Sequence, residues 1–170
     1  MRPRLFEDPK LLVTRAGDLS LSGQALLELM RAVLARGVPF RFRARGWSMT
    51  PFIRDGDVIT VSPLLHTSAS LGEVVAFVHP ATGGLLVHRV VDRRGTSFVI
   101  QGDSAPEEAD WAIRGESLIG RVTRVERNGR NVWLGLGPER YVIAWLSHAG
   151  WLIPMRNWLA SWLRPLLRSR

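Results

Sequence analysis

Residues 38–51 read VPFRFRARGWSMTP, and this stretch decides the fold class. Its first half alternates with a period of two, so that two phenylalanines and an alanine share one face and three arginines share the other. This alternation predicts a strand with one face buried and one face in water. The second half, from Gly46 to Pro51, predicts a tight turn that holds Ser48 just ahead of the next strand.

Further short strands are predicted along the chain, separated by glycine-rich turns. They cover Asp57–Val61, Glu73–Val78, Leu85–Asp92, Ser97–Gln101, Leu118–Val125 and Asn131–Leu134. The dipeptide Asn128-Gly129 is a strong signal for a two-residue hairpin turn. Short strands at this spacing predict a mainly β protein, built as a small closed or folded-over antiparallel domain.

One helix is predicted ahead of the strands, from Ser22-Gly23 to Arg36, with Gly37 ending it. Its apolar residues recur at helical spacing, and they are Leu26, Leu29, Met30, Val33 and Leu34. We predict that residues 1–20 form an irregular segment, the lead-in, ahead of this helix. The sequence thus divides into a lead-in with an amphipathic helix (1–37), a β-domain (38–137) and a helical tail rich in tryptophan and arginine (138–170).

Arginine supplies almost all of the positive charge of this chain. The formal net charge is +8, and Lys10 is the only lysine. Because arginine does not give up its proton, a Ser–Lys mechanism has no plausible base near Ser48. The positive field favours anionic partners, although an arginine-rich genome accounts for the composition equally well. We expect no nucleic acid binding, because the aromatic residues of the first strand alternate inward, away from its arginines. The absence of cysteine excludes disulfides and thiol chemistry.

The tail contains an apolar run, residues 141–155, that is too short to cross a bilayer as a helix. Its tryptophans suit the membrane–water boundary and its arginines suit anionic head groups. We therefore expect peripheral attachment to a membrane through residues 138–170. A single tilted C-terminal anchor, helices packed back on the β-domain and a dimer contact remain alternatives.

Three separate fragments carry a hydroxyl, an imidazole and carboxylates in the order that a nucleophilic hydrolase uses. They are Ser48 in the turn, His88 in Val87-His88-Arg89-Val90, and Asp103 and Asp110 in and after Gly102-Asp103-Ser104. Taken singly, each is more often a turn residue or a core histidine. Taken together they favour catalysis, since each lies at the edge of a different predicted element. The other histidines lack metal-ligand spacing, so we expect no metal and no cofactor.

These motifs resemble those of the type I signal peptidase superfamily, which also contains the LexA-type self-cleaving repressors. The resemblance rests on Gly-Trp-Ser-Met-Thr-Pro with Asp-Gly-Asp-Val, Gly-Glu-Val-Val-Ala-Phe, Val-His-Arg-Val-Val and Gly-Asp-Ser, and it spans Val38 to Val125. It implies a signal-peptidase-like β-domain. Most bacterial members have a lysine where this chain has His88, so the chain looks like the Ser–His branch.

The resemblance implies acyl transfer by Ser48, with His88 as general base and then general acid. Either Asp110 or Asp103 would orient the imidazole, and we favour Asp110, with Asp103 ordering the site. The oxyanion would meet backbone N–H groups at Trp47, Ser48 and Met49. The substrate would be an extended peptide segment of a precursor protein, added as a strand beside the site, with small side chains before the cleaved bond.

The resemblance implies a serine endopeptidase that cleaves signal or leader peptides. One departure concerns the N-terminus, where relatives carry a membrane-spanning helix and this chain has an amphipathic one. Either the tail attaches the enzyme to a membrane, or the enzyme works in the cytoplasm on a leader peptide. Two other functions stay open, namely a LexA-type self-cleaving regulator and a non-catalytic peptide-binding or membrane-docking domain.

Overall fold

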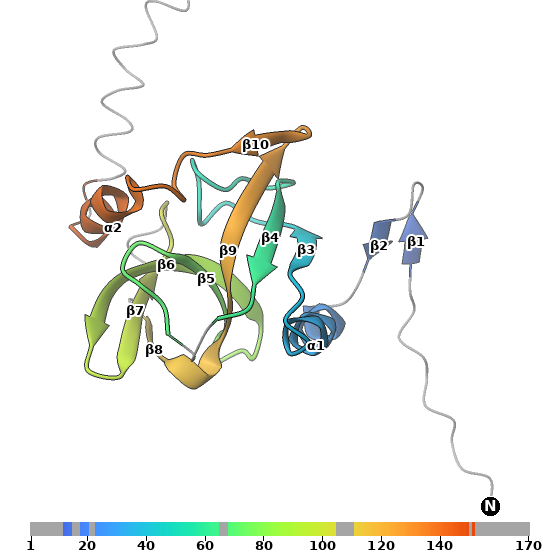
Figure 1. Ribbon diagram of the computed structural model, residues 1–170, viewed down its shortest axis with the longest axis horizontal. Coiled ribbons are helices and arrows are strands. Elements are labelled where there is room, and N and C mark those ends of the chain that lie inside the picture. The colour runs from blue at the N-terminus through green and yellow to red at the C-terminus, as the bar shows by residue number, and fades with distance from the viewer. Residues whose placement is uncertain are drawn as a thin grey trace, which may run out of the picture.

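The computed structural model describes residues 12–14, 18–20, 23–64, 68–104, 111–149 and 151. Two helices and ten strands follow one another along these residues (Figure 1). In chain order they are β1 (Leu12–Thr14), β2 (Asp18–Ser20), α1 (Gly23–Leu34), β3 (Phe40–Arg43), β4 (Val58–Ser62), β5 (Val74–Val78), β6 (Leu85–Arg94), β7 (Ser97–Gln101), β8 (Trp111–Arg114), β9 (Leu118–Arg127), β10 (Arg130–Val132) and α2 (Arg140–His148).

Eight of these strands form one antiparallel sheet, in the order β3-β4-β9-β5-β6-β7-β8, with β10 paired to β9. Figure 1 shows that the sheet is strongly curved, with α1 beside β3 and α2 beside the β6–β7 part of the sheet. The predicted fold class is therefore confirmed: a mainly β antiparallel domain with one helix before it and one after it.

The predicted strands match the observed ones closely, because each is a short alternating or apolar run bounded by turn residues. For β3 to β7, β9 and β10, each end lies within two residues of its predicted position. The hairpin at Asn128-Gly129 is also confirmed. Both residues have positive φ, 51° and 74°, as a two-residue turn between β9 and β10 requires.

Three strands were not predicted. Residues 12–14 and 18–20 form a two-stranded antiparallel hairpin, β1–β2, where the sequence predicted an irregular lead-in. Residues 111–114 form β8, which pairs with β7 at the end of the sheet. Among Ala112, Ile113 and Arg114, Ile113 alone is deeply buried, so these three residues offer a short and weak signal for a strand.

The core divides into two clusters, one on each face of β5. Val74 and Ala76 pack in one cluster with α1, β4 and β9, whereas Val75 and Phe77 pack in the other with β6, β7 and β8. All four side chains are almost completely buried. The strand is covered on both faces, which explains why its sequence is a continuous apolar run and does not alternate.

Helix α1 buries Leu27, Met30 and Leu34, which follow one another at spacings of three and four, and the last two belong to the first cluster. Leu29, which the sequence placed in the inward stripe, is instead 42% exposed. Gly37 has a φ of +76° and its N–H donates to the carbonyl of Leu34, so it ends the helix as predicted.

Helix α2 carries apolar residues on its exposed side as well as on its buried side. Its buried side carries Ile143, Ala144 and Ser147. Its exposed side carries Tyr141, Val142 and Trp145. Within the described residues, no helix is both long and apolar enough to cross a membrane. Most of the rest of the predicted tail, residues 150 and 152–170, lies outside the described residues.

Candidate active site

Ser48 lies in the turn between β3 and β4, and the turn is held at both ends. Gly46, with a φ of +95°, donates its N–H to the Asp55 carboxylate at 2.9 Å. The N–H of Thr50 donates to the carbonyl of Trp47 at 3.0 Å. Met49 is buried in the first core cluster, so the residue after the serine fixes the turn to the core.

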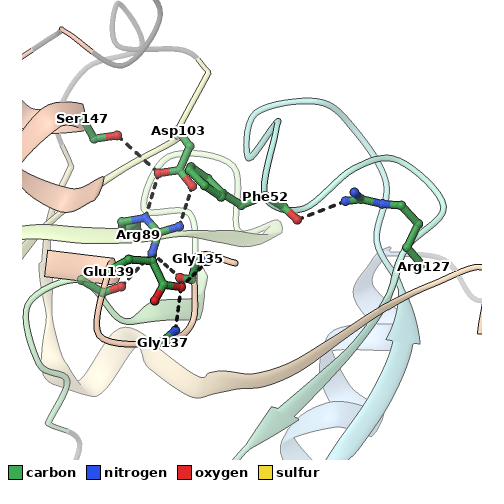
Figure 2. A network of polar contacts seen from close by, with 9 residues as sticks. Phe52, Arg89, Asp103, Arg127, Gly135, Gly137, Glu139 and Ser147 are labelled. Atoms are coloured by element: carbon green, nitrogen blue, oxygen red, sulfur yellow. Dashed lines mark hydrogen bonds and ion pairs between the residues drawn. The ribbon is translucent and has the colours of Figure 1, made fainter. Parts of the chain in front are cut away.

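The far end of the loop is held by an ion pair. Asp57 accepts hydrogen bonds from the Arg127 guanidinium at 2.9 and 2.7 Å, and Arg127 also donates to the carbonyl of Phe52 (Figure 2). Burial raises the pKa of the Asp57 carboxyl, but the hydrogen bonds from Arg127 and from the Arg54 N–H outweigh it and bring the pKa below its ordinary value. The carboxylate therefore stays charged and paired.

His88 on β6 faces the serine. Its Nε2 atom lies 2.8 Å from Ser48 Oγ, which is hydrogen-bond distance. The imidazole is 2% exposed and stands against the ring of Phe77, with 6.0 Å between the ring centroids. For the hydroxyl to donate, Nε2 must be the unprotonated nitrogen of the neutral ring.

The surroundings of His88 favour this neutral form. Burial, together with repulsion from His79, lowers the pKa of His88 from 6.5 to about 4. The ring is therefore uncharged at neutral pH and can accept the proton of Ser48. This meets the first requirement for a general base, which is hydrogen-bond contact with the group that it deprotonates.

Gly102 lies so close to both groups that no side chain fits there. A methyl group at this position would stand 2.9 Å from the carbonyl oxygen of Ser48 and 3.4 Å from His88 Nε2. Two bonds from Ser104 hold this segment on the turn: its N–H donates to the carbonyl of Ser48 and its hydroxyl donates to that of Trp47. The Gly-Asp-Ser motif thus brings its backbone against the serine.

Asp103 forms a buried ion pair with Arg89, the residue after His88. Arg89 Nε and Nη2 donate to the two carboxylate oxygens of Asp103, each at 2.8 Å, and both side chains are almost fully buried (Figure 2). Asp103 also accepts a bond of 3.3 Å from the hydroxyl of Ser147 on α2. Its carboxylate therefore faces Arg89 and α2. Asp110, which we favoured as the partner of His88, lies outside the described residues.

No role was predicted for Arg89, although it lies at the centre of this network. Its Nη1 donates to the carbonyls of Gly72 and Gly135, each at 2.8 Å, and its guanidinium stands 5.4 Å from the ring centre of Phe52. Glu139 accepts the N–H groups of Gly135 and Gly137, which holds the loop before α2 in place. A signal was present, because an arginine inside an apolar strand requires an acidic partner.

The predicted oxyanion residues Trp47 and Met49 differ in their surroundings. Trp47 is 66% exposed, so it is not a core residue, whereas Met49 is buried and lines a cavity that reaches Ser48. Within the described turn, the hydrogen bonds use the N–H groups of Gly46 and Thr50, and none uses those of Trp47, Ser48 or Met49. The oxyanion role of these groups stays a prediction.

The cavity beside Ser48 has a volume of about 400 Å³. Residues of β3 and the following turn form one wall, and the start of β6 forms the other. Apolar side chains of α1, β4 and the turn close it at the back, among them Leu26, Ile59 and Ile53. A reactive hydroxyl at the end of an apolar groove suits the binding and cleavage of a peptide.

Comparison with known proteins agrees with this geometry. None of the curated proteins compared with the chain matches it significantly. Residues 16–123, well over half of the chain, match the family described as Peptidase S24-like. The matched range contains the turn with Ser48, His88 on β6, and the Gly-Asp-Ser motif. The chain therefore belongs to the Peptidase S24-like family, which confirms the resemblance to the signal peptidase and LexA-type superfamily.

Proposed function

We propose that this protein is a serine endopeptidase of the Ser–His branch, which cleaves signal or leader peptides from precursor proteins. The observation that carries the proposal is the 2.8 Å contact between Ser48 Oγ and Nε2 of the buried imidazole of His88. Ser48 lines a cavity of about 400 Å³, and the family is one of serine peptidases.

The proposed reaction has two acyl-transfer steps. Ser48 Oγ bonds to the scissile carbonyl carbon while its proton moves to His88 Nε2. The carbon–nitrogen bond then breaks, and His88 returns the proton to the leaving amine. In the second step a water molecule gives its proton to His88 and attacks the acyl-enzyme, which releases the new carboxyl terminus and restores Ser48.

The carboxylates have separate roles in this proposal. Asp103 is a positioning residue, because its pair with Arg89 holds Gly102 on one side and the backbone beside His88 on the other. Asp110 stays our candidate for the partner of the imidazole, and the order of the motifs along the chain is the only support for it. The new oxyanion would be met by N–H groups at Ser48 and its neighbours.

A second candidate, self-cleavage, is favoured by one observation. Gly23, the first residue of α1, lines the same cavity as Ser48. The first residue of α1 therefore lies at the groove, and the chain ahead of it could supply its own scissile bond. An intramolecular reaction of this kind has a rate that does not depend on protein concentration, whereas cleavage of a separate substrate does.

Attachment to a membrane surface is also part of the proposal. Tyr141, Val142 and Trp145 share the exposed side of α2, and Trp133 and Leu134 are exposed in the segment before it. Tryptophan and tyrosine favour the interface between water and lipid. Beyond α2 the sequence continues with further tryptophans and with Arg156, Arg164, Arg168 and Arg170, which suit anionic head groups.

Ser48→Ala and His88→Ala should each lower turnover by a factor on the order of 10⁴, because the two residues act as one unit. Labelling by a serine-reactive fluorophosphonate should be lost in both variants and kept in wild type. The change Ser97→Ala, at a half-buried serine on β7, is the control and should label normally. Equal labelling of all four proteins would exclude the proposed chemistry.

Mass spectrometry of the incubated wild-type chain, at two protein concentrations, separates self-cleavage from cleavage of an added peptide.

The value of kcat/KM should decrease only at a lower pH than in an enzyme whose catalytic histidine has an unshifted pKa. The neutral imidazole is the active form, so activity is lost as pH falls through the pKa of His88 in the free enzyme. With that pKa at about 4, activity should persist through pH 6 and 5. The measurement is a pH profile with a fluorogenic peptide, with near-UV circular dichroism at each pH to establish that the fold is intact. A midpoint near 6.5 in folded protein would contradict this assignment.

Gly102→Ala should lower kcat by roughly 10²-fold, because its methyl group displaces the serine from the histidine by a fraction of an ångström or more. Gly23→Ala is the matched control, since nothing lies within 4 Å of a methyl group there, although that residue also lines the groove. The control should keep kcat within about twofold. Wild-type kcat in a folded Gly102→Ala variant would show that this close approach is unimportant.

Trp145→Ala combined with Val142→Ser should weaken binding to vesicles of phosphatidylglycerol and phosphatidylcholine by roughly tenfold, because exposed apolar area is removed. The measurement is co-sedimentation of the full chain at low salt. Leu71→Ser, an exposed apolar change elsewhere, is the control and should bind like wild type. Membrane attachment through α2 would be refuted if the double variant also bound like wild type, or if wild type did not bind.

A further inference from the structure

The groove beside Ser48 runs between the edges of two strands. β3 is the first strand of the sheet, with β4 on one side of it. On the other wall, β6 pairs with β5 along Leu85–Arg89, whereas its pairing with β7 begins only at Arg89. In the described part of the chain, no strand therefore pairs with the second edge of Leu85–Val87. The space between the two edges suits one extended peptide.

The backbone groups beside β3 are turned toward this space in alternation. The N–H of Ala44 donates to the carbonyl of Asp57, and its carbonyl accepts from the N–H of Gly56, so both groups of Ala44 point toward the β4 side. Successive residues of a strand point their backbone groups to opposite edges. Those of Arg43 and Arg45 therefore point toward the groove, and both residues line it.

The side chains of this wall also alternate, and the two faces differ in chemistry. Phe42 and Ala44 are half-buried and pack against the core, whereas Arg41, Arg43 and Arg45 are exposed on the opposite face. A peptide that pairs with this segment has the same alternation, because residues opposite each other project from the same face. One set of its side chains enters the apolar cavity, and the other set stands beside the arginines.

The charges near this wall leave it positive. Arg41 is paired with Glu126 at 2.6 Å, and Arg43 donates to the carbonyl of Gly56 on the β4 side at 3.0 Å. Arg45, which is exposed and lines the groove, is therefore the cation that matters for the substrate. The nearby carboxylate Asp55 accepts the N–H of Gly46, and Arg54 adds a further positive charge beside it.

We propose that the peptide bound in this groove places apolar side chains in the cavity and an acidic side chain between them beside Arg45, which selects the acidic residue. This inference rests on the proposed function and names its substrate class. An opposite-charge pair across two strands favours binding by about two- to fivefold at low salt, and a like-charge pair disfavours it similarly. The preference therefore depends on salt as well as on sequence.

The test uses three quenched fluorogenic peptides with one apolar pattern, whose intervening positions all carry Glu, Gln or Lys. With the full-length protein, kcat/KM should fall in that order, by about tenfold or more between the Glu and Lys peptides at low salt. The difference should shrink at 0.5 M NaCl. Arg45→Glu should reverse the order, mainly through KM. The matched control is Arg114→Glu on β8, at the opposite end of the sheet from β3, and it should keep the wild-type order.

Equal kcat/KM for the three peptides, or an order that Arg45→Glu does not change, would overturn this inference while leaving the peptidase proposal intact. If none of the peptides is cleaved, their binding to Ser48→Ala is measured by fluorescence anisotropy. Tighter binding of the Glu peptide, reversed by Arg45→Glu, then supports the inference even though the catalytic proposal has failed. Binding without regard to charge overturns it.

Discussion

The buried pair of Arg89 and Asp103 is the interaction on which the rest of the site depends. Two charges taken out of water are tolerated only when they are paired and fully hydrogen-bonded, and here every contact with the pair comes from a different part of the chain. β6, the Gly-Asp-Ser segment, α2 and the loop before it all meet at these two side chains. Removing one partner would leave the other charge buried and uncompensated, at a cost of about 3–5 kcal/mol.

Two consecutive residues of β6 have different roles, one in the proposed chemistry and one in holding the structure together. Successive side chains of a strand point to opposite faces, so His88 meets Ser48 while Arg89 meets Asp103 behind it. The Gly-Asp-Ser segment shows the same division of roles, because Gly102 lies against Ser48 whereas the Asp103 carboxylate faces Arg89. The residues that contact Ser48 and the residues of the buried ion pair are therefore neighbours in the sequence, but they point to opposite sides of the backbone.

The sequence predicted those features that have a strong local pattern. Alternating strands and the hairpin at Asn128-Gly129 belong to this class. The pairing of Ser48 with His88, forty residues apart, was instead predicted from the order of the motifs and the family resemblance. It did not predict β8, which is only four residues long, or the role of Arg89, whose partner lies fourteen residues away. Trp47 is exposed because the turn directs it outward, a property that composition does not reveal. Tertiary context decided each of these cases.

The arginine face of β3 has a consequence for the behaviour of the protein in concentrated solution. A strand at the end of a sheet can pair with the same strand of another copy, which leads to aggregation. Antiparallel pairing of two β3 strands would place the arginines of one copy opposite those of the other. Like charges in that position repel, so the edge resists a second copy of itself while it stays open to a chain of different charge. Self-recognition is thus disfavoured by the residues that line the groove.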